Sequence, residues 1–498
     1  MENSEAVHEN RGPEGADRHA RLFTAEELAG VVGGTCRGKL DAEIFSVAAD
    51  SRAVRPGSLF VALSGERTDG HQYLRDAVAA GASALLISIA KKENVLGALR
   101  GLERAAELGL IFVESPLAAL QSAAREHRQR HSFTRIGVTG SSGKTTTKEC
   151  IGAVLAASYP PGSVAMSPGN LNSDIGLALA LFDLRSEHQV GVFEMGINRV
   201  GEMDELARMY EPQIAVVTNI GTAHVGIFGT RDGIAHEKSR IFSHFSGTQR
   251  ALIWEDDDYR AFLASRAHGR VSYFGLRNTE GLGAIENRGV RGWSIAWRNQ
   301  RIEFALPGRH NLINACAALS VANVLGLDPE KAARGLSGVQ ALFGRSEIRE
   351  GAITIVQDCY NANPDSVASA IEFFAELPPE GRKILVLGSM RELGDATERA
   401  HRGVGTLAGR AAPAAIFLFG DEMRAAEEAL SEDGFGGSVL CTSDFDELSA
   451  AVRGFVRAGD FVLIKGSRAM ALERLVSDLE RAGLLPAVEA DKGGSHAS

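Results

Sequence analysis

Short apolar runs alternate with helix-length segments along most of this chain. In the first third, the apolar runs cover residues 59–63, 84–89 and 110–113, and the helical segments cover residues 71–80 and 116–130. Upstream of them, Thr24 and Glu27 have the spacing of a capping box, in which Thr24 caps a helix and Glu27 reaches back to it. The alternation of buried strands with helices predicts a small α/β domain.

The same alternation continues through the rest of the chain. Strand candidates of the middle third lie at 135–139, 189–193 and 214–217, with a helix at 144–157, and those of the last third lie at 353–356, 383–387, 415–419, 439–441 and 461–464. This order favours parallel sheets with crossover helices, and the last third is typical of a Rossmann-like domain. Asn363 and Pro364 have the residue types of an N-cap and a first helical position.

The length of the chain indicates several domains. Its 498 residues predict roughly three, since a domain usually has about 100–200 residues. We expect a flexible extension at 1–21, a small α/β domain at 22–132, a central domain at 133–336 and a Rossmann-like domain at 337–498. The fold class is therefore α/β with three domains.

Composition narrows the class of protein. Hydrophobic residues make up 44% and charged residues 23%, which is typical of globular enzymes, and no apolar run approaches the ~18 residues of a membrane helix. Residues 1–21 lack the apolar core of a signal peptide, and five scattered cysteines favour reduced thiols, so we expect a cytoplasmic protein. The net charge of −10 argues against nucleic-acid binding, which is largely cation-to-phosphate. Anionic ligands must be bound by local basic residues.

A glycine-rich loop follows the first strand of the middle domain. It consists of Gly140, Ser141, Ser142, Gly143, Lys144, Thr145 and Thr146. Glycines let backbone amides turn toward a polyphosphate, and the helix behind adds the positive end of its dipole. Lys144 would neutralise phosphate charge, and Thr145 has the position of a ligand to the bridging Mg²⁺. The strict motif requires Gly where Val138 stands, so the loop departs from the generic pattern.

Two further residues are candidates for the metal site. Glu194 follows an apolar run, at the carboxyl end of a predicted parallel strand, where such sheets bind ligands. It is either a metal ligand or a surface glutamate at a strand end. His224 lies beyond the next strand and is either a ligand or a structural histidine.

Taken together, these segments resemble the Mur ligase family from about residue 22 to residue 484. Residues 138–146 look like that family's own phosphate loop, which accounts for Val138. Residues 358–364 and 387–394 look like the family member that adds D-alanyl-D-alanine to UDP-N-acetylmuramoyl-tripeptide. The resemblance implies a UDP-sugar-binding domain at 22–132 and an ATP-binding phosphate-loop domain at 133–336. It also implies ATP and Mg²⁺ as cofactors and an acyl-phosphate intermediate.

The resemblance also implies roles for individual residues. Mg²⁺ would be bound by Thr145, Glu194, His224 and Lys238, the last of these as a carbamate, and the catalytic residues would be Lys144, His224, Lys238 and Arg345. The nucleotide would also contact Asn314, Arg345 and Asp358. The substrates would contact Ser51, Asn170, Asn172, Tyr360 and Asn361.

Each of these assignments has a structural alternative. Lys238 could instead be an exposed lysine on a helix, and Asn311 could simply cap the helix that follows. Arg345 and Asp358 could instead form buried ion pairs. The segment of residues 465–468, which includes Lys465, either steadies the dipeptide carboxylate or begins a helix. Leu171 stands where relatives usually have Tyr, and Ser389 replaces a common Asp, which leaves dipeptide selectivity open.

Three other functions compete with this hypothesis. A Mur ligase that adds the third amino acid is expected to show an Asp-Tyr-Ala-His-type segment instead of residues 360–363. A nucleotide-dependent switch or transport ATPase would usually end a strand in an Asp-Glu pair, unlike residues 193–196. A sugar-nucleotide-binding protein without catalysis would not need Lys144, Thr145 and Glu194. We expect a monomer.

Overall fold

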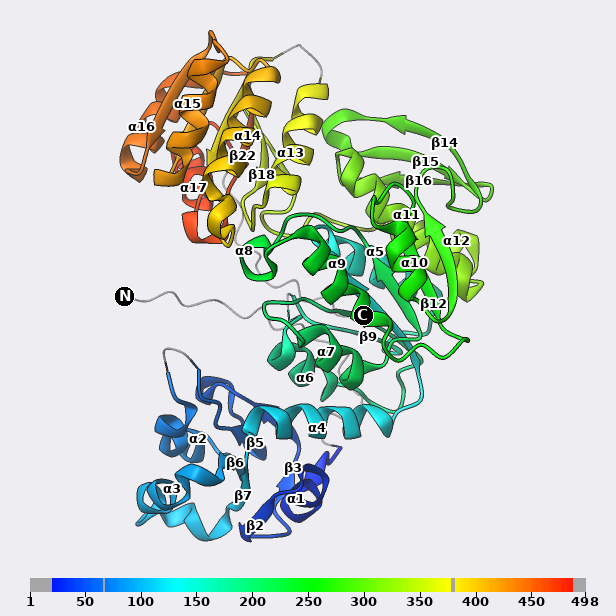
Figure 1. Cartoon of the computed structure of the whole chain (residues 1–498), viewed down its shortest axis with the longest axis vertical. Coiled ribbons are helices and arrows are strands. Elements are labelled where there is room, and N and C mark those ends of the chain that lie inside the picture. Colours follow the sequence, from blue (N-terminus) through cyan, green and yellow to red (C-terminus); the bar gives the residue numbers. More distant parts are fainter. Residues whose placement is uncertain (1–19, 66–67, 170, 378–380, 487–498) are drawn as a thin grey trace.

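Three structural units follow one another along the molecule. The computed structural model describes residues 20–65, 68–169, 171–377 and 381–486. The blue N-terminal unit, the green middle unit and the yellow-to-red C-terminal unit lie in a row, and each is built on its own mostly parallel sheet (Figure 1). The predicted α/β class with three domains is confirmed, whereas the boundaries at residues 132 and 336 stay predictions. Among the described residues, no helix is long and apolar enough to span a membrane.

The first domain has a sheet in the order β2-β7-β6-β5-β4. Its strands are β1 (Phe23–Thr24), β2 (Thr35–Gly38), β3 (Glu43–Ile44), β4 (Ser46–Ala48), β5 (Ser58–Val61), β6 (Ala84–Ser88) and β7 (Gly109–Val113), and its helices are α1 (Ala25–Val32), α2 (Leu74–Ala79), α3 (Lys92–Leu99) and α4 (Pro116–Gln129). Strand β2 is antiparallel to β7. The predicted capping box is present, because Glu27 N donates to Thr24 Oγ1 at 3.2 Å and Thr24 N donates to Glu27 Oε2 at 2.7 Å.

Helix α4 connects the first domain to the middle domain. The buried Arg128 donates from Nε to the carbonyl of Met209 at 3.1 Å, and His127 Nε2 lies 3.1 Å from the carbonyl oxygen of Leu184. Burial, with a smaller effect of His131, lowers the pKa of His127 to about 4. A neutral histidine is therefore part of this contact.

The middle domain has a parallel sheet in the order β13-β12-β11-β8-β10-β9. The strands are β8 (Thr134–Thr139), β9 (Val164–Met166), β10 (Val190–Glu194), β11 (Ile214–Val217), β12 (Arg250–Trp254) and β13 (Arg270–Phe274), and the helices are α5 (Lys144–Ser158), α6 (Asp174–Leu181), α7 (Glu202–Tyr210), α8 (Val225–Phe228), α9 (Arg231–Ser239), α10 (Arg260–Arg266), α11 (Arg309–Leu325) and α12 (Pro329–Ser337). A small antiparallel sheet, which the sequence did not predict, contains β14 (Leu282–Asn287), β15 (Trp293–Trp297) and β16 (Gln300–Phe304).

Both faces of the central sheet are covered. Val192 packs into the apolar cluster under α5 and α11, while its neighbour Phe193 packs into the cluster under α6 and α7. Successive strand residues point to opposite faces, so a strand buried on both sides reads as a continuous apolar run. This explains why residues 189–193 and 214–217 were recognisable as strands.

The third domain has a sheet in the order β17-β18-β22-β19-β20-β21. The strands are β17 (Glu347–Glu350), β18 (Thr354–Asp358), β19 (Lys383–Gly388), β20 (Ala415–Phe419), β21 (Ser438–Thr442) and β22 (Phe461–Lys465), and the helices are α13 (Pro364–Glu376), α14 (Thr397–Arg410), α15 (Arg424–Glu432), α16 (Phe445–Phe455) and α17 (Glu473–Arg481). Strand β17 is antiparallel to β18. The predicted cap of α13 is present, with Asn363 at the N-cap and Pro364 at the first helical position.

Candidate active site

The glycine-rich loop leaves the sheet at the point where the strand order reverses. Strand β8 lies between β10 and β11, and the chain continues toward β9 and β10 on one side and toward β12 and β13 on the other. Parallel α/β sheets bind ligands at such a switch point, outside the carboxyl ends of the strands. The fold therefore places this loop beside a binding crevice.

The backbone conformation of the loop requires glycine at two positions. Gly140 has φ 150° and Gly143 has φ 79°, values that L side chains rarely adopt. A Cβ atom at Gly140 would lie 1.8 Å from Thr218 Oγ1, and one at Gly143 would lie 2.7 Å from Asn314 Oδ1. The loop is thus packed against the end of β11 and against α11, and its last three residues, Lys144 to Thr146, form the first turn of α5.

The segment after β11 braces the loop from the side. Ser142 N donates to Asn219 Oδ1 at 2.9 Å, and Thr218 Oγ1 donates to the carbonyl of Ser142 at 2.6 Å. Ser141 Oγ accepts from Gly221 N at 2.9 Å. These contacts were not predicted from the sequence. A signal for them was present, because Thr218 and Asn219 directly follow a buried strand at the same sheet edge.

Charged side chains meet next to the loop. Lys144 Nζ donates to the carbonyl of Gly140 at 2.9 Å. Burial lowers the pKa of Lys144, Glu194 raises it and Arg345 lowers it further. Residues from the loop, from β10 and from the start of the third domain are therefore close enough to influence one another electrostatically.

Glu194 is the centre of the polar contacts. It is the last residue of β10 and is buried. Its Oε2 accepts from Thr145 Oγ1 at 2.7 Å, and its Oε1 accepts from Asn172 Nδ2 at 2.7 Å. One carboxylate thus connects the phosphate loop with the loop that precedes α6, and the reading of Glu194 as a surface residue is wrong.

Lys238 on α9 is completely buried, and its Nζ has no hydrogen-bond partner among the described residues. Burial holds the pKa of this amine well below its usual range, Lys144 lowers it further, and Glu194 acts in the opposite direction. The alternative of an exposed helical lysine is wrong. An unpaired amine in the interior needs an explanation, because buried polar groups are almost always bonded.

His224 contacts the third domain rather than Glu194. It is the N-cap of α8 with φ 64°, and its Nδ1 lies 2.8 Å from Oε2 of Glu392, which has φ 65°. Gly226 N donates to the carbonyl of Glu392 at 3.3 Å in the same contact. Two residues with left-handed backbones therefore face each other across the domain interface, and such strain is typical of functional sites.

Two further contacts join the phosphate loop to the third domain. Asn363 Nδ2 donates to Ser142 Oγ at 3.1 Å, so the N-terminus of α13 lies at the loop. Asp365 Oδ2 accepts from Thr222 N at 2.6 Å and from Thr222 Oγ1 at 2.7 Å. Asn363 is thus both a helix cap and an interdomain contact, and only its first role was predicted.

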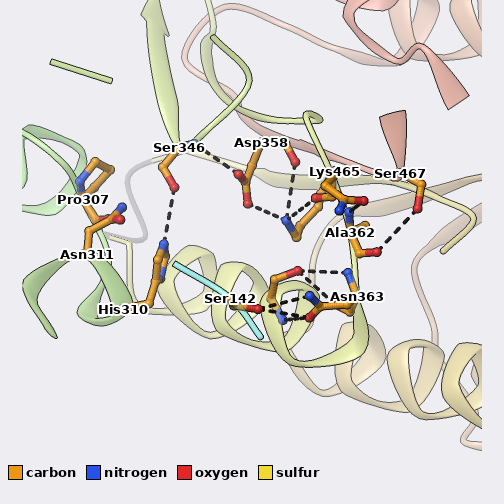
Figure 2. A network of polar contacts seen from close by, with 12 residues as sticks. Ser142, Pro307, His310, Asn311, Ser346, Asp358, Ala362, Asn363, Lys465 and Ser467 are labelled. Carbon is orange, nitrogen blue, oxygen red and sulfur yellow. Dashed lines mark hydrogen bonds and ion pairs between the residues drawn. The ribbon is translucent and has the colours of Figure 1, made fainter. Parts of the chain in front are cut away.

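The third domain also contributes a buried ion pair (Figure 2). Lys465 Nζ, at the end of β22, lies 2.7 Å from Asp358 Oδ2 and donates to the carbonyl of Asn361 at 3.2 Å. The segment after β22 does begin a helix, the 3₁₀ turn Arg468–Met470 with Ser467 at its N-cap, whereas Lys465 itself is the last residue of the strand. The Cζ atom of Arg345 lies 4.1 Å from the ring centroid of Tyr360, which is the geometry of a cation–π contact rather than an ion pair.

Helix α11 of the middle domain contacts the helix that follows the phosphate loop. Asn314 Oδ1 accepts from Thr147 Oγ1 at 3.1 Å, and Asn314 Nδ2 donates to Asn311 Oδ1 at 3.2 Å. The hypothesis that Asn311 caps the helix is wrong, because Gly308 is the N-cap and Asn311 donates to the carbonyl of Pro307 at 2.7 Å. Tertiary packing, with Asn311 buried inside the first turn, decided this.

Two predicted residues are not part of this cluster. Ser51 belongs to the first domain, in the 3₁₀ turn Ser51–Ala53. Asn170 lies outside the described residues. Within the described ranges, no group of three or more His, Cys, Asp and Glu side chains forms a metal site by itself.

Comparisons with known proteins cover most of the chain. The Mur ligase family catalytic domain matches residues 43–128, the Mur ligase middle domain matches residues 138–322, and the Mur ligase glutamate ligase domain matches residues 344–468. The UDP-N-acetylmuramoyl-tripeptide–D-alanyl-D-alanine ligase of Treponema pallidum is 40% identical over 460 residues, which are 91% of this chain and 98% of the relative. The ligase of the same name from Bacillus subtilis is 34% identical over 441 residues, 88% and 93% of the two chains.

Solved structures agree with these relatives. A crystal structure of MurF from Acinetobacter baumannii has a TM-score of 0.81 at 30% identity and covers 92% of this chain and 99% of that one. MurF ligase from Thermotoga maritima, solved in complex with ADP, has a TM-score of 0.73 at 29% identity and covers 88% and 97%. Three matched domains and a relative at 40% identity over nearly the whole length leave one assignment: the chain belongs to the Mur ligase family.

Proposed function

We propose that this chain is an ATP-dependent ligase that joins D-alanyl-D-alanine to UDP-N-acetylmuramoyl-tripeptide. Full-length relatives named for this reaction support the proposal, as does the ADP complex of the Thermotoga maritima structure. The observation that carries it is the bridge made by Glu194, which accepts from Thr145 of the phosphate loop and from Asn172 of the loop before α6. A single carboxylate between two binding loops suits a reaction between a nucleotide and a second substrate.

The residues around Glu194 fit a magnesium ion. Mg²⁺ prefers oxygen ligands and is usually bound through one or two carboxylates together with substrate phosphates. Thr145 and Glu194 offer such oxygens next to the phosphate loop. When bound, the ion would neutralise charge on the phosphates.

We extend the metal site to Lys238 and His224. A protonated Lys238 would repel the ion, and a neutral amine offers it only a nitrogen, whereas reaction with CO₂ would turn the amine into a carbamate with oxygen ligands. Two observations support this modification: Lys238 Nζ has no hydrogen-bond partner in the described ranges, and its pKa is depressed, so that the amine is neutral, which is the form that reacts with CO₂. His224 Nδ1 faces Glu392, which leaves Nε2 available to the metal site.

The reaction would run through an acyl phosphate. The terminal carboxylate oxygen of the tripeptide attacks the γ-phosphorus of ATP, and ADP leaves. The amine of the dipeptide then attacks the acyl carbon, inorganic phosphate leaves, and the nitrogen loses a proton. Loop amides and Lys144 would hold the phosphates, and Arg345 would stabilise charge on the transferred group from the third domain.

Other predicted residues would hold the substrates. Asn314 and Asp358 would position the nucleotide base and ribose region, and Ser51 would contact the uridine part of the second substrate. Asn170 and Asn172 would contact the tripeptide substrate, and Tyr360 and Asn361 would lie near the reacting ends. Leu171 and Ser389 are where selectivity for the dipeptide would differ from that of relatives. We include a monomeric state and a cytoplasmic location in this proposal.

One assay tests the proposal against its rivals. The enzyme is incubated with MgATP, with either UDP-N-acetylmuramoyl-tripeptide or the corresponding UDP-linked dipeptide, and with a panel of amines, and the products are weighed by mass spectrometry. We expect a product heavier by one dehydrated D-alanyl-D-alanine, with ADP formed only when both the carboxylate and the amine substrate are present. Addition of a single amino acid to the UDP-linked dipeptide would favour the sibling ligase. Formation of ADP without an acceptor would favour a switch or transport ATPase. Binding of the UDP-linked substrate without formation of ADP would favour a sugar-nucleotide-binding protein.

A further inference from the structure

Lys148 is a second completely buried lysine of the middle domain, and no step of the proposed reaction uses it. Lysine is rarely buried completely, because its ammonium group loses hydration that must be replaced. Here three groups replace it: Nζ donates to the carbonyl of Ser167 at 2.8 Å and to that of Gly169 at 2.9 Å, and lies 2.9 Å from Glu149 Oε1.

The carbonyls bonded to Lys148 belong to the loop that carries Asn172. Ser167 Oγ also accepts from the backbone N–H of Glu194 at 3.1 Å. At the other end of the loop, Gly196 N donates to the carbonyl of Asn172 at 2.8 Å. The loop is therefore fixed at its start by Lys148 and Glu194 and at its end by the segment after β10.

These contacts close a ring around the proposed site. Lys148 lies three residues after Thr145 on α5, so both side chains leave the same face of the helix that follows the phosphate loop. Thr145 bonds to Glu194, Glu194 bonds to Asn172, and the loop of Asn172 bonds back to Lys148. A displacement of the loop would therefore move Asn172 relative to the phosphate loop.

We propose that Lys148 is a positioning residue that holds the described parts of the loop before α6, residues 167–169 and 171–172, in register with the phosphate loop. It would not touch the nucleotide or the second substrate. Its effect would be on the binding of the UDP-linked tripeptide through Asn172, and much less on the binding of ATP. The proposal rests on the proposed function for the identity of that substrate.

The test compares binding of the two substrates to Lys148→Met by titration calorimetry, using UDP-N-acetylmuramoyl-tripeptide and a non-hydrolysable ATP analogue. We expect the Kd of the UDP-linked substrate to rise about tenfold or more, while the Kd of the nucleotide changes by less than about twofold. Lys383→Met is the matched control, since Lys383 Nζ donates to a backbone carbonyl of the third domain, that of Ala375. It should leave both Kd values unchanged.

A double-mutant cycle with Asn172→Ala separates positioning from a general loss of structure. If Lys148 acts through Asn172, Lys148→Met should cost much less binding in the Asn172→Ala background than in the wild type. Additive effects, or equal rises in both Kd values, would overturn the proposal. Should Lys148→Met not fold, Lys148→Gln keeps a donor for the loop carbonyls without a buried charge and is judged by the same criteria. Failure of the wild type to bind the UDP-linked substrate would refute the proposed function instead.

Discussion

Replacing Lys238 by methionine should stabilise the folded protein while it removes ligase activity. The Nζ atom of Lys238 is buried and has no hydrogen-bond partner within the part of the chain that the structure describes, and burial holds its pKa well below the usual range. Methionine has a similar length and volume, fills the same space and has no polar group to leave unpaired. The two effects on stability and activity therefore have opposite signs at one residue.

The size of the stabilisation follows from the missing hydrogen bonds. A buried polar group without a partner costs about 1–3 kcal/mol, and a volume-conserving change in a core usually costs less than about 1.5 kcal/mol. We expect a net gain of about 1–2 kcal/mol for Lys238→Met. In a domain of about 200 residues this corresponds to a rise in Tm of about 2–8 °C.

The assay is thermal unfolding in CO₂-depleted buffer without magnesium, so that the lysine is compared as a free amine. Lys148→Met is the control, because Lys148 is equally buried but bonded to two carbonyls and to Glu149. Its removal leaves those partners unsatisfied and should destabilise the protein by about 2 kcal/mol or more. The two lysine-to-methionine changes should thus shift Tm in opposite directions.

A Tm of Lys238→Met equal to or below that of the wild type would refute this reasoning, since it would show that the amine has partners in solution. Activity tests the other half of the argument. Wild-type turnover should depend on bicarbonate, and the intact protein should gain the mass of one CO₂. A variant with normal turnover would show that Lys238 has no part in the reaction.

Three further predictions concern other contacts. Arg345→Lys should lower kcat about a hundredfold, because ammonium lacks the planar fork that stacks on Tyr360 and reaches phosphate oxygens, and equal turnover would contradict this. Glu392→Gln should raise the Mg²⁺ concentration for half-maximal activity about tenfold, because His224 would lose the contact that orients it. An unchanged magnesium dependence would show that Glu392 does not act on the metal site through His224. His127 has a pKa of about 4 when folded against an ordinary 6.5, so protons bind preferentially to the unfolded chain between these values and stability falls as pH is lowered through them. Urea unfolding of His127→Phe should therefore lose about 2 kcal/mol less than the wild type between pH 7 and pH 5, and parallel pH dependences would exclude the assignment.

Local signals in the sequence determined most of the elements around the site. The run at residues 214–217 coincides with β11, and the run at 415–419 coincides with β20, because strands buried on both faces must be apolar throughout. The caps at Thr24 and Asn363 were recognisable because their hydrogen bonds reach only three residues along the chain. The glycine-rich loop was recognisable because Gly140 and Gly143 need backbone conformations that other residues avoid.

Only the tertiary structure decided which of these residues meet. The bond from Thr145 to Glu194 spans 49 positions, and the bond from Asn363 to Ser142 spans 221, so no local pattern specifies them. The small sheet of β14, β15 and β16 went unpredicted because β14 and β16, which are largely exposed on one side, form no apolar run, although β15 is buried along most of its length. The lysines show the same limit most sharply. Lys148 and Lys238 are the same residue type on two helices of one domain, α5 and α9. Only packing gives Lys148 three partners and leaves Lys238 without any among the described residues.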